Sequence, residues 1–378
     1  MNQSFIPLAK PEFGPIEKEL VNKALDTGWI SSIGSFVEEF ADEFTQAVNT
    51  NYALPVCNGT AALHLALIAL GIGKGDEVIV PALSFVASAN TVTYVGAEPV
   101  FVDIDPKTLN LDLNQVEAAI TKKTKALMTV DLYGHPVDFD AFSKLAKKHK
   151  LHFISDSAES LGSRYKGKPV GNQADVATFS FFGNKIVTTG EGGILVTNDK
   201  KIYETAKLYR DQGKDTTIHN YYHPVIGYNY GMTNLQAAVG IGQLKQLNAF
   251  VAKKRRIADS YRKLLKGVPG ITFQQEAEYA QSNWWMFSIL VDQQKFGRSR
   301  DELMKLLLTN NIETRPFFYP LSKLPPYQQA NQTKDFPVTY KLADQGMNLP
   351  SFAGLTDEEI NYVVKIIKLV IGSHQGKA

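Results

Sequence analysis

Short apolar runs alternate with amphipathic stretches from about residue 50 to residue 198. Apolar side chains recur with helical spacing in 59–70 and 140–150. The runs between them read as buried strands, which cover 52–56, 76–81, 98–105, 125–134, 151–156, 174–181 and 192–198. Strands and helices in this alternation predict an α/β domain in which helices cover both faces of a mainly parallel sheet.

The pattern changes in the last third of the chain. Residues 233–268 predict one long helix or two joined helices, with Thr233 and Gln236 at the spacing of a capping box. Two strands and a closing helix follow, at 283–292, 310–320 and 356–373. We therefore expect a large domain over 1–245 and a smaller C-terminal α+β domain over 246–378.

Composition and charge narrow the class of protein. The net charge of the 378 residues is +2, which gives no reason to expect nucleic acid or an anionic membrane as a partner. The basic run Lys253–Arg256 reads as a solvated helix face. Cys57 is the only cysteine, and neither a signal peptide nor a run of roughly 20 apolar residues is present. We expect a cytoplasmic protein without an intrachain disulfide, a membrane span or a metal site.

Three segments carry candidate chemistry at predicted strand ends, where ligands of open parallel sheets bind. In the first, Asn58-Gly59-Thr60 follows the strand 52–56 and opens a helix. Free N–H groups at such a helix start favour a phosphate, and glycine lets the backbone come close to it. The alternative is an ordinary strand–helix turn in which Thr60 is the cap.

The other two segments supply a carboxylate and a lysine. Asp156 ends an apolar strand and is either the N-cap of a following helix or the partner of a cation in the cleft. Ser180 ends the next strand, and Lys185 follows it before a glycine-rich return at 190–193. A lysine at the rim of an apolar pocket is either a surface charge or a nucleophile with a lowered pKa.

An anion cradle, a carboxylate and a lysine at three strand ends of one sheet together suit pyridoxal phosphate. The lysine forms the covalent link, the carboxylate keeps the pyridine nitrogen protonated, and the helix N–H groups hold the phosphate. Phe85 follows a predicted strand and would stack on the ring, although a core position is the commoner place for a phenylalanine.

The chain also resembles a known family almost from end to end. The motifs that carry the likeness are "TGWISSIGSFVEEFADEF", "DLYGHPVD", "DSAESLGSRYKGKPVG", "FSFFGNKIVTTGEGG", "IGYNYGMTN", "IETRPFFYP" and "MNLPSF". In this order they resemble the DegT/DnrJ/EryC1/StrS sugar aminotransferases, which are fold-type I pyridoxal-phosphate enzymes. The resemblance implies a large domain with a mainly parallel, mixed seven-stranded sheet between helices and a smaller C-terminal α+β domain.

The resemblance also assigns roles to individual residues. It implies that Lys185 binds the cofactor covalently, that Asp156 pairs with the pyridine nitrogen, and that Glu159 lies by the phenolic oxygen. Gly59, Thr60 and Ser180 would hold the phosphate, and Phe85 would stack on the ring. Asn229 would reach the phosphate of a neighbouring subunit, so a homodimer with shared active sites is implied. The segments that line the sugar-nucleotide side in the family correspond here to Trp29, Ser31, His135, Arg315 and Tyr319.

The family's substrates are nucleotide-linked keto-sugars, with L-glutamate as amino donor. The motifs favour amination of C4 of GDP-4-keto-6-deoxymannose, for surface polysaccharide or O-antigen synthesis. A UDP-linked 4-keto-6-deoxy sugar is the alternative. A sugar dehydratase is the less favoured reading, because in those relatives a histidine stands where this chain has Lys185. Gly231 departs from the family, since relatives often carry an arginine at this position.

Overall fold

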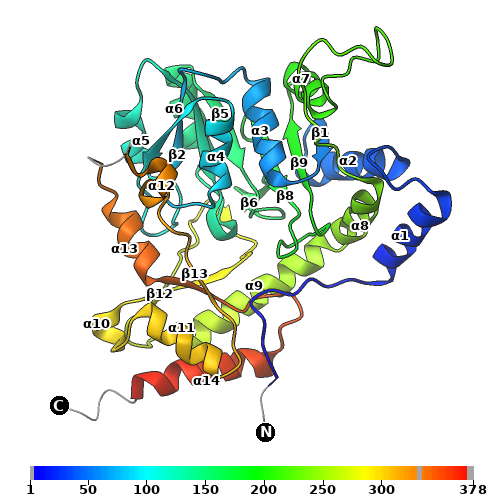
Figure 1. Cartoon of the computed structure of the whole chain (residues 1–378). Helices are drawn as coiled ribbons and strands as arrows, with labels where there is room; N and C mark the ends of the chain where they lie inside the picture. The colour runs from blue at the N-terminus through cyan, green and yellow to red at the C-terminus, as the bar shows by residue number, and fades with distance from the viewer. Residues whose placement is uncertain (1–3, 330–333, 373–378) are drawn as a thin grey trace.

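The computed structural model describes residues 4–329 and 334–372, and it has a larger and a smaller part (Figure 1). The larger part is built on a seven-stranded sheet with the order β1-β9-β8-β5-β4-β2-β3. Its strands are β1 (Tyr52–Val56), β2 (Glu77–Pro81), β3 (Glu98–Val102), β4 (Thr124–Val130), β5 (His152–Asp156), β8 (Val176–Ser180) and β9 (Gly193–Thr197). β9 runs antiparallel to both of its neighbours, β1 and β8, and the other neighbouring strands of this sheet are parallel. The prediction of a mainly parallel, mixed sheet is confirmed.

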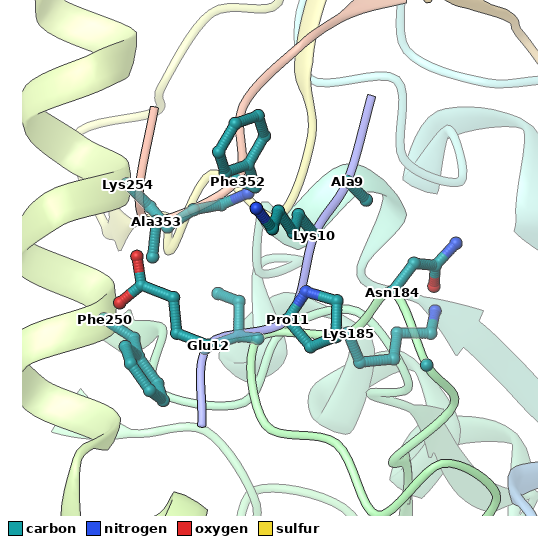
Figure 2. A pocket seen from close by; sticks show the side chains of 12 residues that line it. Ala9, Lys10, Pro11, Glu12, Asn184, Lys185, Phe250, Lys254, Phe352 and Ala353 are labelled. Atoms are coloured by element: carbon teal, nitrogen blue, oxygen red, sulfur yellow. The ribbon is translucent and has the colours of Figure 1, made fainter. Parts of the chain in front are cut away.

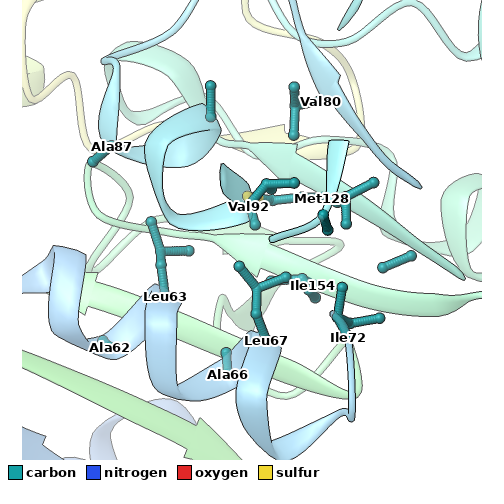
Figure 3. Packing of buried hydrophobic residues seen from close by; sticks show 14 of the residues in the cluster. Ala62, Leu63, Ala66, Leu67, Ile72, Val80, Ala87, Val92, Met128 and Ile154 are labelled. Atoms are coloured by element: carbon teal, nitrogen blue, oxygen red, sulfur yellow. The ribbon is translucent and has the colours of Figure 1, made fainter. Parts of the chain in front are cut away.

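Helices cover both faces of this sheet because its strands point buried side chains in both directions. On one face, Leu63 and Leu67 of α3 (Gly59–Ala69) lie over Val80, Met128 and Ile154, and α4 (Ala87–Tyr94) packs beside them (Figure 3). α7 (Lys200–Arg210) contacts the β1–β9 edge.

The other face is covered in two places. The first cover consists of α1 (Pro15–Thr27), α2 (Ser35–Val48) and α8 (Asn234–Lys245), which share one buried cluster with residues of β8 and β9. The second consists of α5 (Leu113–Ala119) and α6 (Phe139–His149), which pack over β2, β4 and β5. Burial of each large apolar side chain in such layers stabilises the fold by about 1.5–3 kcal/mol.

The smaller part has its own antiparallel sheet, ordered β10-β12-β14-β13. These strands are β10 (Ile271–Phe273), β12 (Phe287–Val291), β13 (Arg315–Pro316) and β14 (Gly346–Leu349). α9 (Leu247–Leu265), α11 (Arg300–Thr309) and α14 (Asp357–Gly372) pack around it (Figure 1). The shorter elements are β6 (Arg164–Tyr165), β7 (Lys168–Pro169), β11 (Ala280–Gln281), α10 (Gln293–Phe296), α12 (Pro325–Gln328), α13 (Pro337–Gln345), and the 3₁₀ turns η1 (Leu132–Gly134) and η2 (Leu321–Lys323).

The two parts are joined at several points. α8 begins with the expected capping box of Thr233 and Gln236, and α8 and α9 are two helices separated at Gln246. The domain division at residues 245 and 246 stays a prediction. Ile6 falls in the predicted large domain by its number, but it forms a bridge with Ile312 and lies in the core of the smaller part.

Several expected elements differ from those observed. The strands expected at 98–105, 125–134 and 283–292 are shorter, and only Arg315–Pro316 is a strand within 310–320. Residue 373 of the expected closing helix lies outside the described residues. The prediction of a solvated face at Lys253–Arg256 is wrong for Lys254, which is buried because α9 packs its inner side against the chain before β12. Within the described ranges, no helix is both long and apolar enough to cross a membrane.

Candidate active site

A cavity of about 380 Å³ lies at the carboxyl ends of the central strands. The chain brings eight of the thirteen expected site residues to its wall, namely Gly59, Thr60, Phe85, Asp156, Glu159, Ser180, Lys185 and Arg315. Parallel strands end at the same edge of a sheet, which explains why segments far apart in sequence meet here. Arg315 is the contribution of the smaller part, from β13.

Lys185 lies on the loop between β8 and β9, and its side chain is only 12% exposed. Its Nζ is 3.6 Å from Oε1 of Glu159 and 3.7 Å from the centroid of the Trp285 ring. Burial lowers the pKa of Lys185, and the charge of Arg315 acts in the same direction, while Glu159 and Asp156 oppose the shift. A lowered pKa increases the fraction of neutral amine, which is the nucleophilic form.

Asp156 is buried at the end of β5. The Ser88 hydroxyl donates to its Oδ2 over 2.8 Å, and the Ala158 N–H donates to Oδ1 over 3.2 Å. Burial raises the pKa of Asp156, and these hydrogen bonds and the Lys185 charge oppose the rise. No helix begins in the turns after Asp156, so of the two alternatives the structure favours the partner of a cation.

Glu159 is held next to Lys185 by a backbone hydrogen bond. Its Oε2 accepts the Tyr133 N–H over 2.7 Å. Tyr133 has a left-handed backbone conformation with φ 55°, which is uncommon for a large residue and typical of constrained functional segments. Burial raises the pKa of Glu159 to about 6, against the charge of Lys185.

The expected anion cradle is present at the start of α3. Asn58, and not Thr60, is the N-cap, because its Oδ1 accepts the Ala61 N–H over 2.8 Å. The first N–H groups of the helix, at Gly59 and Thr60, have no partner within the helix and are available for an anion. A Cβ added at Gly59 would lie 2.9 Å from the Ser180 Cβ, so the space between these residues is fitted to glycine. The donor set matches the phosphate of pyridoxal phosphate.

The remaining expected residues lie elsewhere on this chain. His135 is fully buried outside the cavity: its Nε2 accepts the Ala277 N–H over 2.9 Å, and its Nδ1 lies 2.7 Å from the Pro136 carbonyl. Burial lowers the pKa of His135 to about 4, which keeps its ring neutral. Four residues are exposed outside the cavity wall, and they are Trp29, Ser31, Asn229 and Tyr319.

The sequence interpretation missed several residues of the cavity wall. Asn184 and Trp285 belong to this set, as do Phe182, Glu191 and Phe318. Phe318 lies 5.8 Å from Phe85 between ring centroids, so an aromatic pair borders the cavity. The tryptophan doublet at 284–285 is a visible signal in the sequence, but the apolar pattern predicts only that it belongs to a strand. The Ser88 contact with Asp156 had no sequence signal, because it depends on how α4 meets the sheet.

Residues 12–368 match the DegT/DnrJ/EryC1/StrS aminotransferase family. The chain belongs to this family. The GDP-perosamine synthase of Escherichia coli O157:H7 is 46% identical over 96% of this chain and 98% of its own length.

Two solved structures are similar over nearly the whole of this aminotransferase. DesV of S. venezuelae, in complex with a ketimine intermediate, has a TM-score of 0.92 and 32% identity, covering 98% of this chain and 99% of its own. The putative sugar aminotransferase Spr1654 of Streptococcus pneumoniae, in its PLP form, has a TM-score of 0.91 and 30% identity, with the same coverage. The protein is therefore a pyridoxal-phosphate-dependent sugar aminotransferase, and the dehydratase reading is excluded.

Proposed function

We propose that this aminotransferase moves the amino group of L-glutamate to C4 of a nucleotide-linked 4-keto-6-deoxy sugar, with GDP-4-keto-6-deoxymannose as the preferred substrate. The position of Lys185 in the wall of a cavity that also holds Asp156 and the α3 N-terminus is the observation that carries the chemistry. The 46% identity to a GDP-perosamine synthase supports the choice of sugar. Amination of a UDP-linked sugar is the alternative outcome of the test.

The bound cofactor supplies an electron sink for the carbon that bears the transferred nitrogen. In our proposal the N–H groups of Gly59 and Thr60 and the Ser180 hydroxyl would hold the phosphate, and Phe85 would pack against the ring. Asp156 would stabilise a proton on the pyridine nitrogen, because a buried carboxylate favours a nearby cation. Ser88 keeps that carboxylate oriented.

Lys185 both anchors the cofactor and moves protons. In each half of the reaction its neutral Nζ would accept a proton from one carbon and deliver it to a second carbon, so that the amine is neutral again at the end of each half. Glu159 is close enough to stabilise the protonated Nζ between these steps, at 3.6 Å. Arg315 places a positive charge in the same cavity, which suits the anionic sugar nucleotide.

The test is incubation of the protein, loaded with pyridoxal phosphate, with glutamate and a panel of GDP- and UDP-linked 4-keto-6-deoxy sugars. We expect a mass change from ketone to amine with the GDP sugar, formed together with 2-oxoglutarate. Amination of UDP sugars alone would favour the alternative substrate. The absence of any amine, with cofactor bound, would contradict the proposal.

We also propose a homodimer with shared active sites. Large apolar side chains are exposed in the 29–33 loop and in 218–226, including Trp29, Ile33, Tyr221 and Ile226. Phe182 is exposed as well and lines the cavity, so the exposed apolar surface reaches the site itself. Such a surface is more typical of a subunit interface than of a monomer. Asn229 would complete the phosphate site of the partner.

Mixing two inactive variants tests this sharing. If the site is shared, a dimer of one Lys185→Ala chain and one Asn229→Asp chain contains one intact site, and activity returns on mixing after refolding. Light scattering should give about twice the chain mass of 41.8 kDa. A monomeric mass, or no recovery in a proven mixed dimer, would contradict the shared site. We also expect cytoplasmic localisation, which fractionation of the source cells would test.

A further inference from the structure

Trp285 contacts the reactive amine through its ring, and the sequence motifs give it no role. Its side chain is buried in the cavity wall, and Nζ of Lys185 lies 3.7 Å from the ring centroid. An ammonium over an aromatic face is stabilised by the negative potential of the ring, and tryptophan provides the strongest such contact.

Trp285 is held in place by three hydrogen bonds. Its indole N–H donates to the Asn184 carbonyl over 2.8 Å, next to Lys185 in the chain. Its backbone N–H donates to Oδ1 of Asn283 over 2.8 Å, and its carbonyl accepts from the buried Lys254 ammonium over 2.6 Å. The ring position is therefore set by both parts of the molecule.

The segment before Trp285 is docked on the same site. The Asn283 amide donates to the carbonyls of Glu159 and Leu161, each over 2.9 Å. Trp284 has a left-handed backbone conformation with φ 51°, a strained state for a large side chain. Trp284 faces Arg262 in the core of the smaller part, 4.0 Å from ring centroid to guanidinium, while Trp285 faces the cavity.

We propose that Trp285 is a positioning residue for Lys185: its indole face holds the protonated Nζ beside Glu159, and its N–H fixes the loop that carries the lysine. The inference rests on the proposed role of Lys185. Through Trp285, the smaller part would help to set the position and protonation of the Lys185 amine, in addition to its contribution of Arg315. When Nζ loses its proton, the attraction to the ring is lost, and the neutral amine is free to turn toward a ligand.

Other charged groups also face this lysine and its loop. They are Asp156, Glu159, Glu191 and Arg315 in the cavity, and Lys10, Glu12 and Lys254 around an adjoining pocket of about 30 Å³ (Figure 2). A test must therefore change the ring while leaving these groups and the packing in place. Fluorinated tryptophans do this, because fluorine weakens the potential of the ring face at nearly constant volume.

The experiment measures the protonation of Lys185 in the full chain without cofactor. Tryptophan analogues with increasing fluorine content are incorporated, and the amine is labelled with acetic anhydride across a pH series. Peptide masses give the pH at half-maximal labelling, with the exposed Lys200 as internal reference. We expect the Lys185 midpoint to fall stepwise, by about one pH unit in total, which is a tenfold loss of proton affinity and within the range of a shielded cation–π contact.

The matched control is the same series in W285F, where Trp29 and Trp284 still carry the fluorine. Its midpoint should not move with fluorine content. A flat series in the unsubstituted chain, or equal slopes in both chains, would overturn the proposal. If W285F does not fold, W284F replaces it with the opposite expectation, a slope equal to that of the unsubstituted chain. The labelling needs neither cofactor nor sugar. The role of Trp285 can therefore be judged even if the proposed function is wrong.

Discussion

Two buried lysines lie on opposite sides of one small pocket, and they differ in almost everything except burial (Figure 2). Lys185 opens onto the large cavity, with two carboxylates within electrostatic range. Lys254 is 7% exposed, and its Nζ donates to the Trp285 and Ser351 carbonyls and contacts the Ser351 hydroxyl. Burial lowers the pKa of both residues, to about 7 for Lys254.

The comparison shows that a lowered pKa alone does not identify a reactive lysine. Lys254 has oxygen partners on the chain and no open space for a substrate, so its amine is a structural donor. Lys185 has a nearby acid, an aromatic face and an adjacent cavity of about 380 Å³. The two lysines differ in their access to a substrate and in the groups that they contact. These differences, more than burial, separate a reactive amine from a structural one.

The largest expected difference between the two lysines is in the reaction rate. Lys185→Ala removes both the covalent anchor and the proton carrier, and we expect amino-sugar formation to fall by about 10⁴-fold or more. Lys254→Ala should lower the rate of the folded protein by less than about tenfold, since Nζ of Lys254 contacts no reacting group. Product mass under initial-rate conditions measures both, and the exposed Lys200→Ala is the control. Similar losses at 185 and 254 would refute the distinction.

For the free energy of unfolding, we expect the larger effect at Lys254. Lys254→Ala leaves buried carbonyl oxygens without their donor, and we expect the free energy of unfolding to fall by about 3 kcal/mol. Lys253→Ala is the matched control on the same helix, because its ion pair with Glu12 is solvent-exposed and contributes about 0.5 kcal/mol. Urea unfolding measures both variants. A Lys254 variant as stable as the Lys253 control would show that the buried amine is dispensable.

The pH dependence of stability provides a third difference. The pKa of Lys254 falls from 10.5 to about 7 on folding. Between these values the unfolded state binds more protons, so stability should rise with pH, by up to about 1.4 kcal/mol per pH unit. Lys254→Met removes the titrating group and provides the reference. We would measure urea unfolding of both chains at about pH 6, 8 and 9, on either side of the folded pKa. The free energy of unfolding of the unsubstituted chain should increase relative to that of Lys254→Met only above about pH 7. A difference that stays constant with pH would contradict this.

The smallest expected effect concerns the acid that only Lys185 possesses. Glu159→Gln removes a negative charge 3.6 Å from Nζ while keeping a similar shape, so the pKa of Lys185 should fall by about one unit. The acetic anhydride labelling midpoint measures it. Glu12→Gln is the control, because Glu12 lines the adjoining pocket and forms its ion pair with Lys253. A labelling midpoint that moves equally in both variants would show that Glu159 has no specific effect on the pKa of Lys185.

Much of the fold and part of the cavity were predictable from the sequence, for a physical reason. Strand ends and the helix start at Gly59 are local patterns, and the rules of parallel sheets bring them to one edge. Lys254 and Trp285 were not predictable in the same way. The basic run at 253–256 has the sequence of a solvent-exposed helix face. Only the packing of α9 shows that Lys254 is buried.

Other differences have equally specific causes. The segment 310–320 has the apolar content of a strand, but only Arg315 and Pro316 pair with a strand, β14, and Ile312 forms an isolated bridge with Ile6. The doublet at 284–285 suggests ordinary strand alternation, but the left-handed backbone at Trp284 precedes β12 and redirects the chain. The resemblance suggested His135 as a substrate residue, whereas its ring connects two buried backbone segments of this chain.

The bridge between Ile6 and Ile312 has a practical consequence for anyone who shortens this chain. Glu313 accepts the Leu8 N–H over 2.8 Å, and Arg315 enters the cavity two positions later. Deleting residues 4–8 should therefore weaken the binding of the anionic substrate that we propose for the cavity, because the segment that leads to Arg315 would lose both of these contacts.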